Sequence, residues 1–282
     1  MPVTDTLPFS DSDCSSQPVK DIYLVHARGL DDDFWSCAFS SPPPPHWLVP
    51  TPGTMDGGEL QYTPPGEEQR MEYSFRGQTI TFSSNSSDGV LNNVGLEPWD
   101  AGYVLLALLE SLGHSSLGDW KDKSVLEVGS GCGFVGLALK MGLHCRDVLC
   151  TDCDDGVLSL LRKNVEPAGV EVRKLDWFEF TDDDVGLGNG FDVIVGSEVI
   201  YTPDHAVLSH LISASLRKGG TAIIVNLNRP GWDQFCHNTE LDARLDVSVK
   251  DVDLEILEAA EGIKGGPTNG GEQYQILTAR RK

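Results

Sequence analysis

One short segment, SVLEVGSGCGFVG at 124–136, constrains the fold of this chain more than any other. It begins with β-branched and apolar residues, as a buried strand does, and runs through three alternate glycines into the start of a helix. Gly129, Gly131 and Gly133 let the backbone turn sharply and approach a ligand where a Cβ would collide. The N–H groups of the following helix point into the same crevice. The segment therefore predicts a site for a nucleotide-like cofactor.

The carboxylate of Glu127 bears on which cofactor binds. Gly131, Gly133 and Gly136 also have the GxGxxG spacing of a dinucleotide fold, so the glycines alone leave a nicotinamide-dependent dehydrogenase open. A dinucleotide-binding strand usually stays apolar two residues before the first glycine, where Glu127 stands. A carboxylate there suits a cofactor with a cationic amino group and no pyrophosphate, and S-adenosylmethionine is such a molecule. The alternative is a solvated glutamate at a strand end.

Composition and charge narrow the class of protein. Apolar residues make up 40% of the 282 residues, enough for a core, and no apolar run approaches the roughly 18 residues of a membrane span. Residues 1–16 lack the basic and apolar regions of a signal peptide. Seven scattered cysteines, an odd number, favour reduced thiols in the cytoplasm, with the nucleus also open.

The formal net charge of −22 bears on partners. Such a surface repels phosphate backbones, which disfavours nucleic acid as the main partner, and it attracts Lys- or Arg-rich protein segments. The acidity also has a plainer explanation, that it keeps the protein in solution. We expect a monomer with a protein substrate that presents a basic segment.

Three regions follow one another along the chain. Residues 1–20 are rich in Asp, Ser and Pro and are expected to be disordered. Residues 21–94 read as a β-rich extension, with a candidate strand at 21–28, a proline-broken loop at 40–68 and a hairpin at 71–82 that turns at Arg76-Gly77. Residues 95–282 form the predicted cofactor-binding domain.

From residue 95 onward, helical and strand patterns alternate. The expected strands cover 125–129, 147–152, 170–175, 191–197 and 221–227, followed by 243–252 and 274–280 around a loop at 262–271. The expected helices cover 97–112, closed by Gly113, and 134–141, 157–165, 206–216 and 232–241. This alternation predicts an α/β fold, a mainly parallel sheet with helices on both faces.

Polar side chains stand where these strands end, at Glu127, Asp152, Asp176, Ser197 and Glu198. Ligands of such sheets bind outside the carboxyl ends of the strands. A carboxylate at Asp152 can accept both hydroxyls of a ribose, although it can also cap the next helix. The indole of Trp177 offers a flat face on which an adenine ring can stack, and Asp176 or nearby backbone can accept a hydrogen bond from the adenine amine. Alternatively, Trp177 is part of the hydrophobic core.

Cysteine and histidine offer weaker signals. Cys150 and Cys153 form a CxxC with no second pair at zinc-site spacing, so no metal is expected. Cys150 reads as core and Cys153 as a wall of the adenine pocket. His205 and His210 fall near the predicted site, but a solvated helix surface explains them equally well.

Residues 124–231 resemble the seven-β-strand class I methyltransferases, specifically the DxxY-motif protein-lysine methyltransferases of the methyltransferase family 16 type. The resemblance rests on VLEVGSGCGFVGLAL at 125–139, LCTDCDDGVLSLLRKNVE at 149–166, KLDW at 174–177, FDVIVGSEVIYTPD at 191–204 and EPWDAG at 97–102. It implies a Rossmann-like seven-stranded sheet and transfer of a methyl group from S-adenosylmethionine to a protein lysine. It also implies cofactor contacts from Glu127, Gly129, Gly131, Asp152 and Trp177, with Trp99 near.

The DxxY position holds Glu198-Val-Ile-Tyr201, a departure of one methylene. The longer acid leaves the acceptor open: a histidine-directed or small-molecule methyltransferase fits the same scaffold, as does a catalytically silent partner that retains the fold. Chemically, a lysine must lose a proton first, at a cost of about 4.6 kcal/mol at pH 7 from a pKa of about 10.4. Glu198 can orient the incoming cation, and Tyr201 can bind it by a hydrogen bond or by cation–π attraction.

Overall fold

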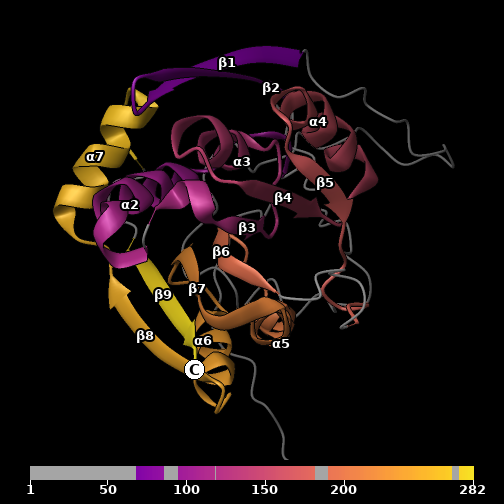
Figure 1. Cartoon of the computed structure of the whole chain (residues 1–282), viewed down its shortest axis with the longest axis vertical. Helices are drawn as coiled ribbons and strands as arrows, with labels where there is room; N and C mark the ends of the chain where they lie inside the picture. Colours follow the sequence, from indigo (N-terminus) through magenta and orange to yellow (C-terminus); the bar gives the residue numbers. More distant parts are fainter. Residues whose placement is uncertain (1–67, 86–94, 118, 182–189, 269–272) are drawn as a thin grey trace, which may run out of the picture. The chain divides into compact units, whose positions relative to one another are not determined.

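The computed structural model describes residues 68–85, 95–117, 119–181, 190–268 and 273–282 (Figure 1). The predicted disordered segment 1–20, the strand at 21–28 and, but for Glu68, the loop at 40–68 lie outside the described residues. The described residues belong to one compact unit, Tyr62–Lys282. None of their helices is long and apolar enough to cross a membrane.

A mixed sheet of seven strands is the centre of this unit. The strands are β3 (Ser124–Glu127), β4 (Asp147–Asp152), β5 (Glu171–Lys174), β6 (Phe191–Ser197), β7 (Leu216–Leu227), β8 (Leu245–Asp251) and β9 (Tyr274–Arg281). Their order across the sheet is β5-β4-β3-β6-β7-β9-β8, and β9 runs in the opposite direction to the other six strands (Figure 1). The strand order reverses direction between β3 and β6, both of which are parallel, so the crevice expected of such a fold opens there.

Helices accompany the strands in the predicted alternation. They are α2 (Asp100–Leu117), α3 (Phe134–Leu137), α4 (Asp155–Val165), α5 (Leu208–Ser215), α6 (Trp232–Glu240) and α7 (Leu254–Lys264). Shorter helical turns are η3 (Trp120–Asp122), η4 (Ala138–Gly142), η5 (Glu166–Ala168) and η6 (Pro203–Val207). Helix α2 is broken at Gly113, where the sequence predicts that it ends: Gly113 adopts φ 53° and ψ −154°, outside the helical region, and a second short helical stretch follows this kink.

Successive side chains of the buried strands point to opposite faces of the sheet and pack into two separate hydrophobic cores. Val125 and Val193 join the core that α2, α3 and α4 cover, whereas Leu126 and Ile194 join the core beneath α5 and α6. Because side chains alternate across a strand, a sheet buried on both faces needs continuous apolar runs. This explains why the sequence of β6 reads as one unbroken apolar stretch after Asp192.

The predicted hairpin is present as β1 (Glu68–Phe75) and β2 (Gln78–Asn85), paired antiparallel through Arg76-Gly77. It packs on the sheet domain: the Tyr73 hydroxyl donates to the Phe134 carbonyl at 2.5 Å, and Asn164 in α4 bonds Ser83 in both directions. The domain boundary at residue 95 stays a prediction, and in the described region the hairpin shares the core of the sheet domain.

Helix α7 is an element that the sequence analysis missed. The expected loop at 262–271 begins inside this helix, which runs from Leu254 to Lys264 and ends at Gly265 with φ 77°. Its apolar face is short, and only Ala260 is fully buried. The helix packs against α2, where Lys264 reaches Asp100 at 2.6 Å, so tertiary contact rather than a strong apolar period stabilises it (Figure 1).

Candidate functional site

The glycine loop after β3 packs against three other segments. Gly129 and Gly131 adopt φ of 61° and 53°, a conformation that disfavours other residues. A Cβ at position 131 would lie 2.9 Å from the carbonyl oxygen of Gly95, and one at position 129 would lie 2.9 Å from Val199 and 3.5 Å from Trp177. The loop therefore lies directly beside the segments that follow β5 and β6.

Asp152, at the end of β4, is half-buried and bonded to this loop. Its Oδ2 accepts the N–H of Gly131 at 3.1 Å, and its Oδ1 accepts the N–H of Cys153 at 2.8 Å. Burial raises its pKa from the usual value, although these N–H donors oppose the rise. Asp154 caps α4 through the Val157 N–H at 2.9 Å. Asp152 is thus free of the capping role and stands where the loop meets the crevice.

Glu127 lies beneath the loop and is 3% exposed. The Cys150 thiol donates to its Oε2 at 3.2 Å, and a Cβ on Gly136 would come within 3.0 Å of the same oxygen. Burial raises its pKa to about 7, and the charge of Asp152 adds to the rise. The solvated-glutamate interpretation is therefore wrong, and the carboxylate points into the protein rather than into open solvent.

The segment after β5 carries the residues predicted to bind the adenine ring. Trp177 is half-buried and lies against the Gly129 position, while the Asp176 Oδ1 accepts the N–H of Phe178 at 2.9 Å. Cys153 is exposed beside Asp152, and Cys150 is fully buried, as the sequence predicts. Burial, together with the charges of Asp152 and Asp176, raises the pKa of the Cys153 thiol, so this side chain stays neutral.

Glu198 follows β6 in a left-handed conformation, φ 53°, with its side chain 7% exposed. Its Oε1 accepts the N–H of Leu227 at 2.7 Å, and its Oε2 lies 3.0 Å from the guanidinium of Arg229. The fully buried Asn226 adds bonds to both backbone groups of Ile200, at 2.9 and 2.8 Å. These contacts tie the segment 198–201 to the end of β7. Strained backbone held by a buried polar network is typical of functional sites.

Tyr201 projects from this segment with 48% of its surface exposed. Burial raises the pKa of its hydroxyl to about 12, and the charge of the Asp152 carboxylate adds to the rise. The ring also contacts His205, at a centroid distance of 4.2 Å. His205 is half-buried against aromatic rings, so a solvated helix surface does not describe it.

The predicted residues gather to different degrees. Asp152 bonds the N–H groups of Gly131 and Cys153, and Trp177 lies against the Gly129 position. Tyr201 is joined to this group only through the charge of Asp152, which helps to raise the pKa of its hydroxyl. Ser197 ends β6 opposite Val225, and Trp99 precedes α2 with its carbonyl bonded to Gly102. Sequence reasoning missed Arg229 and Asn226. The only local signal for them is that polar residues follow the apolar run of β7, at its carboxyl end.

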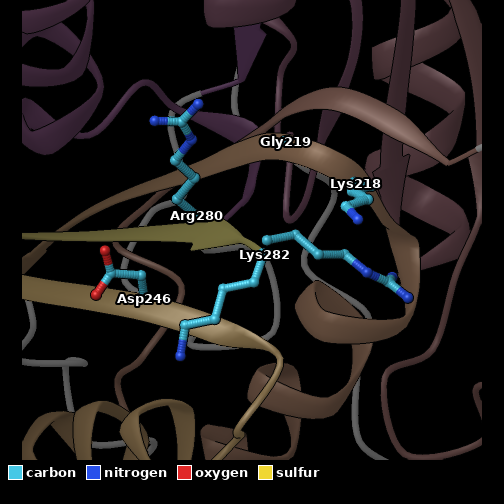
Figure 2. A pocket seen from close by; sticks show the side chains of 6 residues that line it. Lys218, Gly219, Asp246, Arg280 and Lys282 are labelled. Atoms are coloured by element: carbon cyan, nitrogen blue, oxygen red, sulfur yellow. The ribbon is translucent and has the colours of Figure 1, made fainter.

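A second feature, an open hollow of about 350 Å³, lies elsewhere. Its lining includes Lys218, Asp246, Arg280 and Lys282 (Figure 2). Lys218 is near the beginning of β7, whereas Glu198 binds the far end of that strand at Leu227. The hollow is therefore at the amino-terminal edge of the parallel strands, opposite the candidate site, and takes no part in it.

The donor set at the carboxyl edge fits S-adenosylmethionine. The Asp152 Oδ2 accepts one backbone N–H and its Oδ1 accepts two, from Cys153 at 2.8 Å and from Asp154 at 3.3 Å, so the carboxylate keeps acceptor capacity for ribose hydroxyls chiefly on Oδ2. Trp177 is half-buried beside the loop, and the exposed acids Asp154 and Asp204 suit a cation rather than a pyrophosphate. Asp152 and Trp177 would hold the nucleoside, and Glu127 would contribute negative charge from beneath.

Comparisons with known proteins agree with this arrangement. Residues 81–234, more than half of the chain, match the family described as lysine methyltransferase. A Mus musculus protein-lysine N-methyltransferase, EEF2KMT, is 31% identical over 44% of this chain and 40% of its own. The Saccharomyces cerevisiae protein-lysine N-methyltransferase EFM2 is 30% identical over 61% of this chain and 45% of its own. The chain thus spans less than half the length of these two relatives.

A solved structure supports the fold. The Thermus thermophilus ("T. Thermophilus") 16S rRNA N2 G1207 methyltransferase RsmC, solved with AdoMet and guanosine, superposes with a TM-score of 0.52. It is 19% identical and covers 77% of this chain and 52% of its own. The predicted class I methyltransferase fold is confirmed, and with the family the cofactor is S-adenosylmethionine. The chain belongs to the lysine methyltransferase family.

Proposed function

We propose that this protein is an N-methyltransferase that transfers a methyl group from S-adenosylmethionine to a lysine side chain of a protein. The observation that carries the proposal is the position of Tyr201: its side chain is 48% exposed, and its hydroxyl is near enough to Asp152, the residue that we assign to the ribose, for that carboxylate to help raise its pKa. An acceptor that contacts Tyr201 would thus be close to the cofactor. The printed names of both curated relatives, protein-lysine N-methyltransferases, support the choice of lysine.

The residues of the chain would divide the work of positioning. S-adenosylmethionine supplies a methyl group on a positively charged sulfur, and the reaction is an in-line displacement that depends on alignment. Asp152 and Trp177 would fix the nucleoside. The Glu198 carboxylate, bonded to Leu227 and Arg229, would orient the acceptor by fixing the segment that carries Tyr201 and by its negative charge. Tyr201 would bind the acceptor nitrogen through its hydroxyl or its ring face.

The surroundings support a basic protein segment as the substrate. Asp154, Glu179 and Asp204 are exposed on the segments that follow β4, β5 and β6, and the whole chain has a net charge of −22. Such a rim attracts cationic segments and repels phosphate backbones. The five described cysteines are all free thiols, which supports a reducing compartment such as the cytoplasm or nucleus.

The experiment that tests this function is incubation of a cell extract with the full chain and methyl-labelled S-adenosylmethionine. We expect label in a protein band, and methyl-lysine after acid hydrolysis of that band. Methyl-histidine in the hydrolysate would move the acceptor to histidine, and label confined to small molecules would exclude a protein substrate. Cofactor binding without any labelled product would favour a catalytically silent partner.

Replacing Glu198 with alanine should leave the affinity for S-adenosylhomocysteine unchanged and lower turnover about 100-fold or more, a typical effect for a positioned acid–base group. The reason is that Leu227 and Arg229 lose their partner and the segment with Tyr201 is released. Glu198→Asp, which restores the DxxY sequence, should lose part of the turnover because the shorter side chain reaches neither partner as well. Labelling rates and calorimetry of cofactor binding measure both effects.

An exposed glutamate of α6 provides the matched control. Glu240→Ala should change neither quantity, because Glu240 is exposed at the last residue of α6, whereas Glu198 bonds Leu227 and Arg229. Intact turnover with lost cofactor affinity in Glu198→Ala would contradict the assigned role.

A further inference from the structure

One ring nitrogen of His205 makes a hydrogen bond within the protein, and the other has no hydrogen-bond partner among the described residues. It lies in η6, four residues after Tyr201, and its Nδ1 is 2.9 Å from the carbonyl oxygen of Val199. Because a carbonyl oxygen only accepts, Nδ1 carries the proton, and in the neutral ring Nε2 has a free lone pair. Nε2 has no hydrogen bond to the described residues, and it is absent from their fully buried unpaired atoms. The residue as a whole is half-buried, which leaves Nε2 as the ring nitrogen available to a substrate.

Three aromatic side chains surround the imidazole. The Tyr201 ring is perpendicular to it at a centroid distance of 4.2 Å, and those of Trp177 and Phe178 are 5.5 and 6.2 Å away. We call Trp177, Phe178 and Tyr201 the aromatic wall. Trp177 contacts the glycine loop, whereas Phe178 is 59% exposed and Tyr201 48% exposed. The wall thus runs from the cofactor side of the crevice to open solvent, with His205 against it.

The charges around His205 keep the site receptive to a cation. Burial lowers the pKa of His205 below its usual 6.5, although the Val199 carbonyl and Asp204 oppose the shift. The hydroxyl of Tyr201 stays protonated because its pKa is raised to about 12. Among the described residues, the charged groups that act on the wall and on His205 are acids: Asp152 on Tyr201, Asp204 on His205, and Asp176 on the segment that carries Trp177. At neutral pH the imidazole is uncharged and does not repel a lysine.

We propose that His205 receives the proton of the acceptor amine through Nε2, while the faces of Phe178 and Tyr201 bind the acceptor as a cation until that proton leaves. The inference rests on the proposed function and names the residue that prepares its substrate. One N–H bond of the ammonium breaks, its electron pair remains on nitrogen as the nucleophile, and the proton passes from Nε2 to solvent. Aromatic faces attract an ammonium but give no place for its proton, so the wall needs a basic nitrogen beside it.

The test compares His205→Asn with His210→Asn in the full chain. The asparagine amide can still donate to the Val199 carbonyl, so the turn is preserved while the basic nitrogen is removed. His210 is exposed on α5 against Phe180, at a ring distance of 6.0 Å, and provides the matched control. The measurements are the initial rate of protein labelling from pH 6 to 9 and the melting shift caused by S-adenosylhomocysteine.

For His205→Asn we expect labelling about 100-fold slower at pH 7, a deficit that shrinks as pH rises because solvent then removes the proton. The melting shift should not change, and His210→Asn should match the wild type in both measurements. Equal deficits at every pH would assign His205 to structure alone and overturn the proposal. Full activity of His205→Phe, which keeps an aromatic ring without a base, would overturn it as well.

A readout independent of turnover is the titration of the His205 imidazole by NMR, with His205→Asn used to assign its resonance. A pKa below 6.5 is expected, and one above 7 would overturn the proposal because the ring would then be charged. The two hypotheses fail differently. No labelled protein from the wild-type enzyme would refute the lysine methyltransferase function and the inference with it, whereas labelling that is indifferent to His205→Asn would refute the inference alone.

Discussion

Replacing Asp152 with alanine should abolish the protection that S-adenosylhomocysteine gives in a melting experiment. The carboxylate supplies the acceptors that we assign to the ribose hydroxyls, and it also holds the N–H of Gly131 at 3.1 Å. Each hydrogen bond to a charged group contributes about 1.5–3 kcal/mol. Two lost bonds would weaken binding roughly 10²- to 10⁴-fold, which is enough to remove the melting shift at ordinary ligand concentrations.

Two further variants make the result specific to the carboxylate of Asp152. Asp155→Ala removes a neighbouring exposed acid whose partner is Lys174 at 2.9 Å, and it should retain full protection. Asp152→Asn keeps one oxygen for the Gly131 N–H but loses the charge, so an intermediate shift is expected. Unchanged protection in Asp152→Ala would show that the ribose is held elsewhere.

Glu127→Gln should stabilise the ligand-free protein above pH 7 while weakening cofactor binding. Burial raises the pKa of Glu127 to about 7 in the folded state, against 4.5 for an unperturbed glutamate. The group therefore favours folding fully below pH 4.5, and this contribution is lost as pH rises through about 7. At one pKa unit per 1.36 kcal/mol, the loss is on the order of 3 kcal/mol. A neutral glutamine avoids it.

Urea unfolding at pH 5 and pH 8 measures the effect. The free energy of unfolding of the variant should exceed that of the wild type more at pH 8 than at pH 5, and calorimetry should show weaker binding of S-adenosylhomocysteine. Glu179→Gln, at an exposed glutamate after β5, should change neither quantity. If the variant and the wild type show the same dependence on pH, Glu127 does not change its ionisation with folding as stated here.

Much of the fold follows from local sequence patterns. Apolar runs of strand length place β4 and β6 at the expected residues, 147–152 and 191–197, and Arg76-Gly77 places the hairpin. Buried parallel strands are recognisable in the sequence because both of their faces must be apolar. Helix α7 was missed because its one fully buried residue, Ala260, gives little periodic signal and its stabilising contacts come from α2.

Some features of the candidate site are likewise predictable from the sequence, and others depend on tertiary contacts. Glycines and acids at strand ends are visible in the sequence, because a parallel sheet gathers the carboxyl ends of its strands at one edge. The burial of Glu127 was not visible, since it depends on Cys150 from the neighbouring strand and on the start of α3. The ion pair between Glu198 and Arg229 could not be predicted from the sequence either. Arg229 follows β7, and the parallel pairing of β6 with β7 brings it close to Glu198.

The sequence by itself determined the strand and helix alternation, the glycine loop and the edge at which a cofactor binds, because each of these depends on residues that are close along the chain. Only the tertiary structure decided the environments of the ionisable groups: a buried Glu127, a Glu198 bonded to Arg229 and a His205 set against the aromatic wall. A pKa or a hydrogen-bond partner depends on burial and on neighbours from distant segments, and those neighbours are chosen by strand register and helix packing.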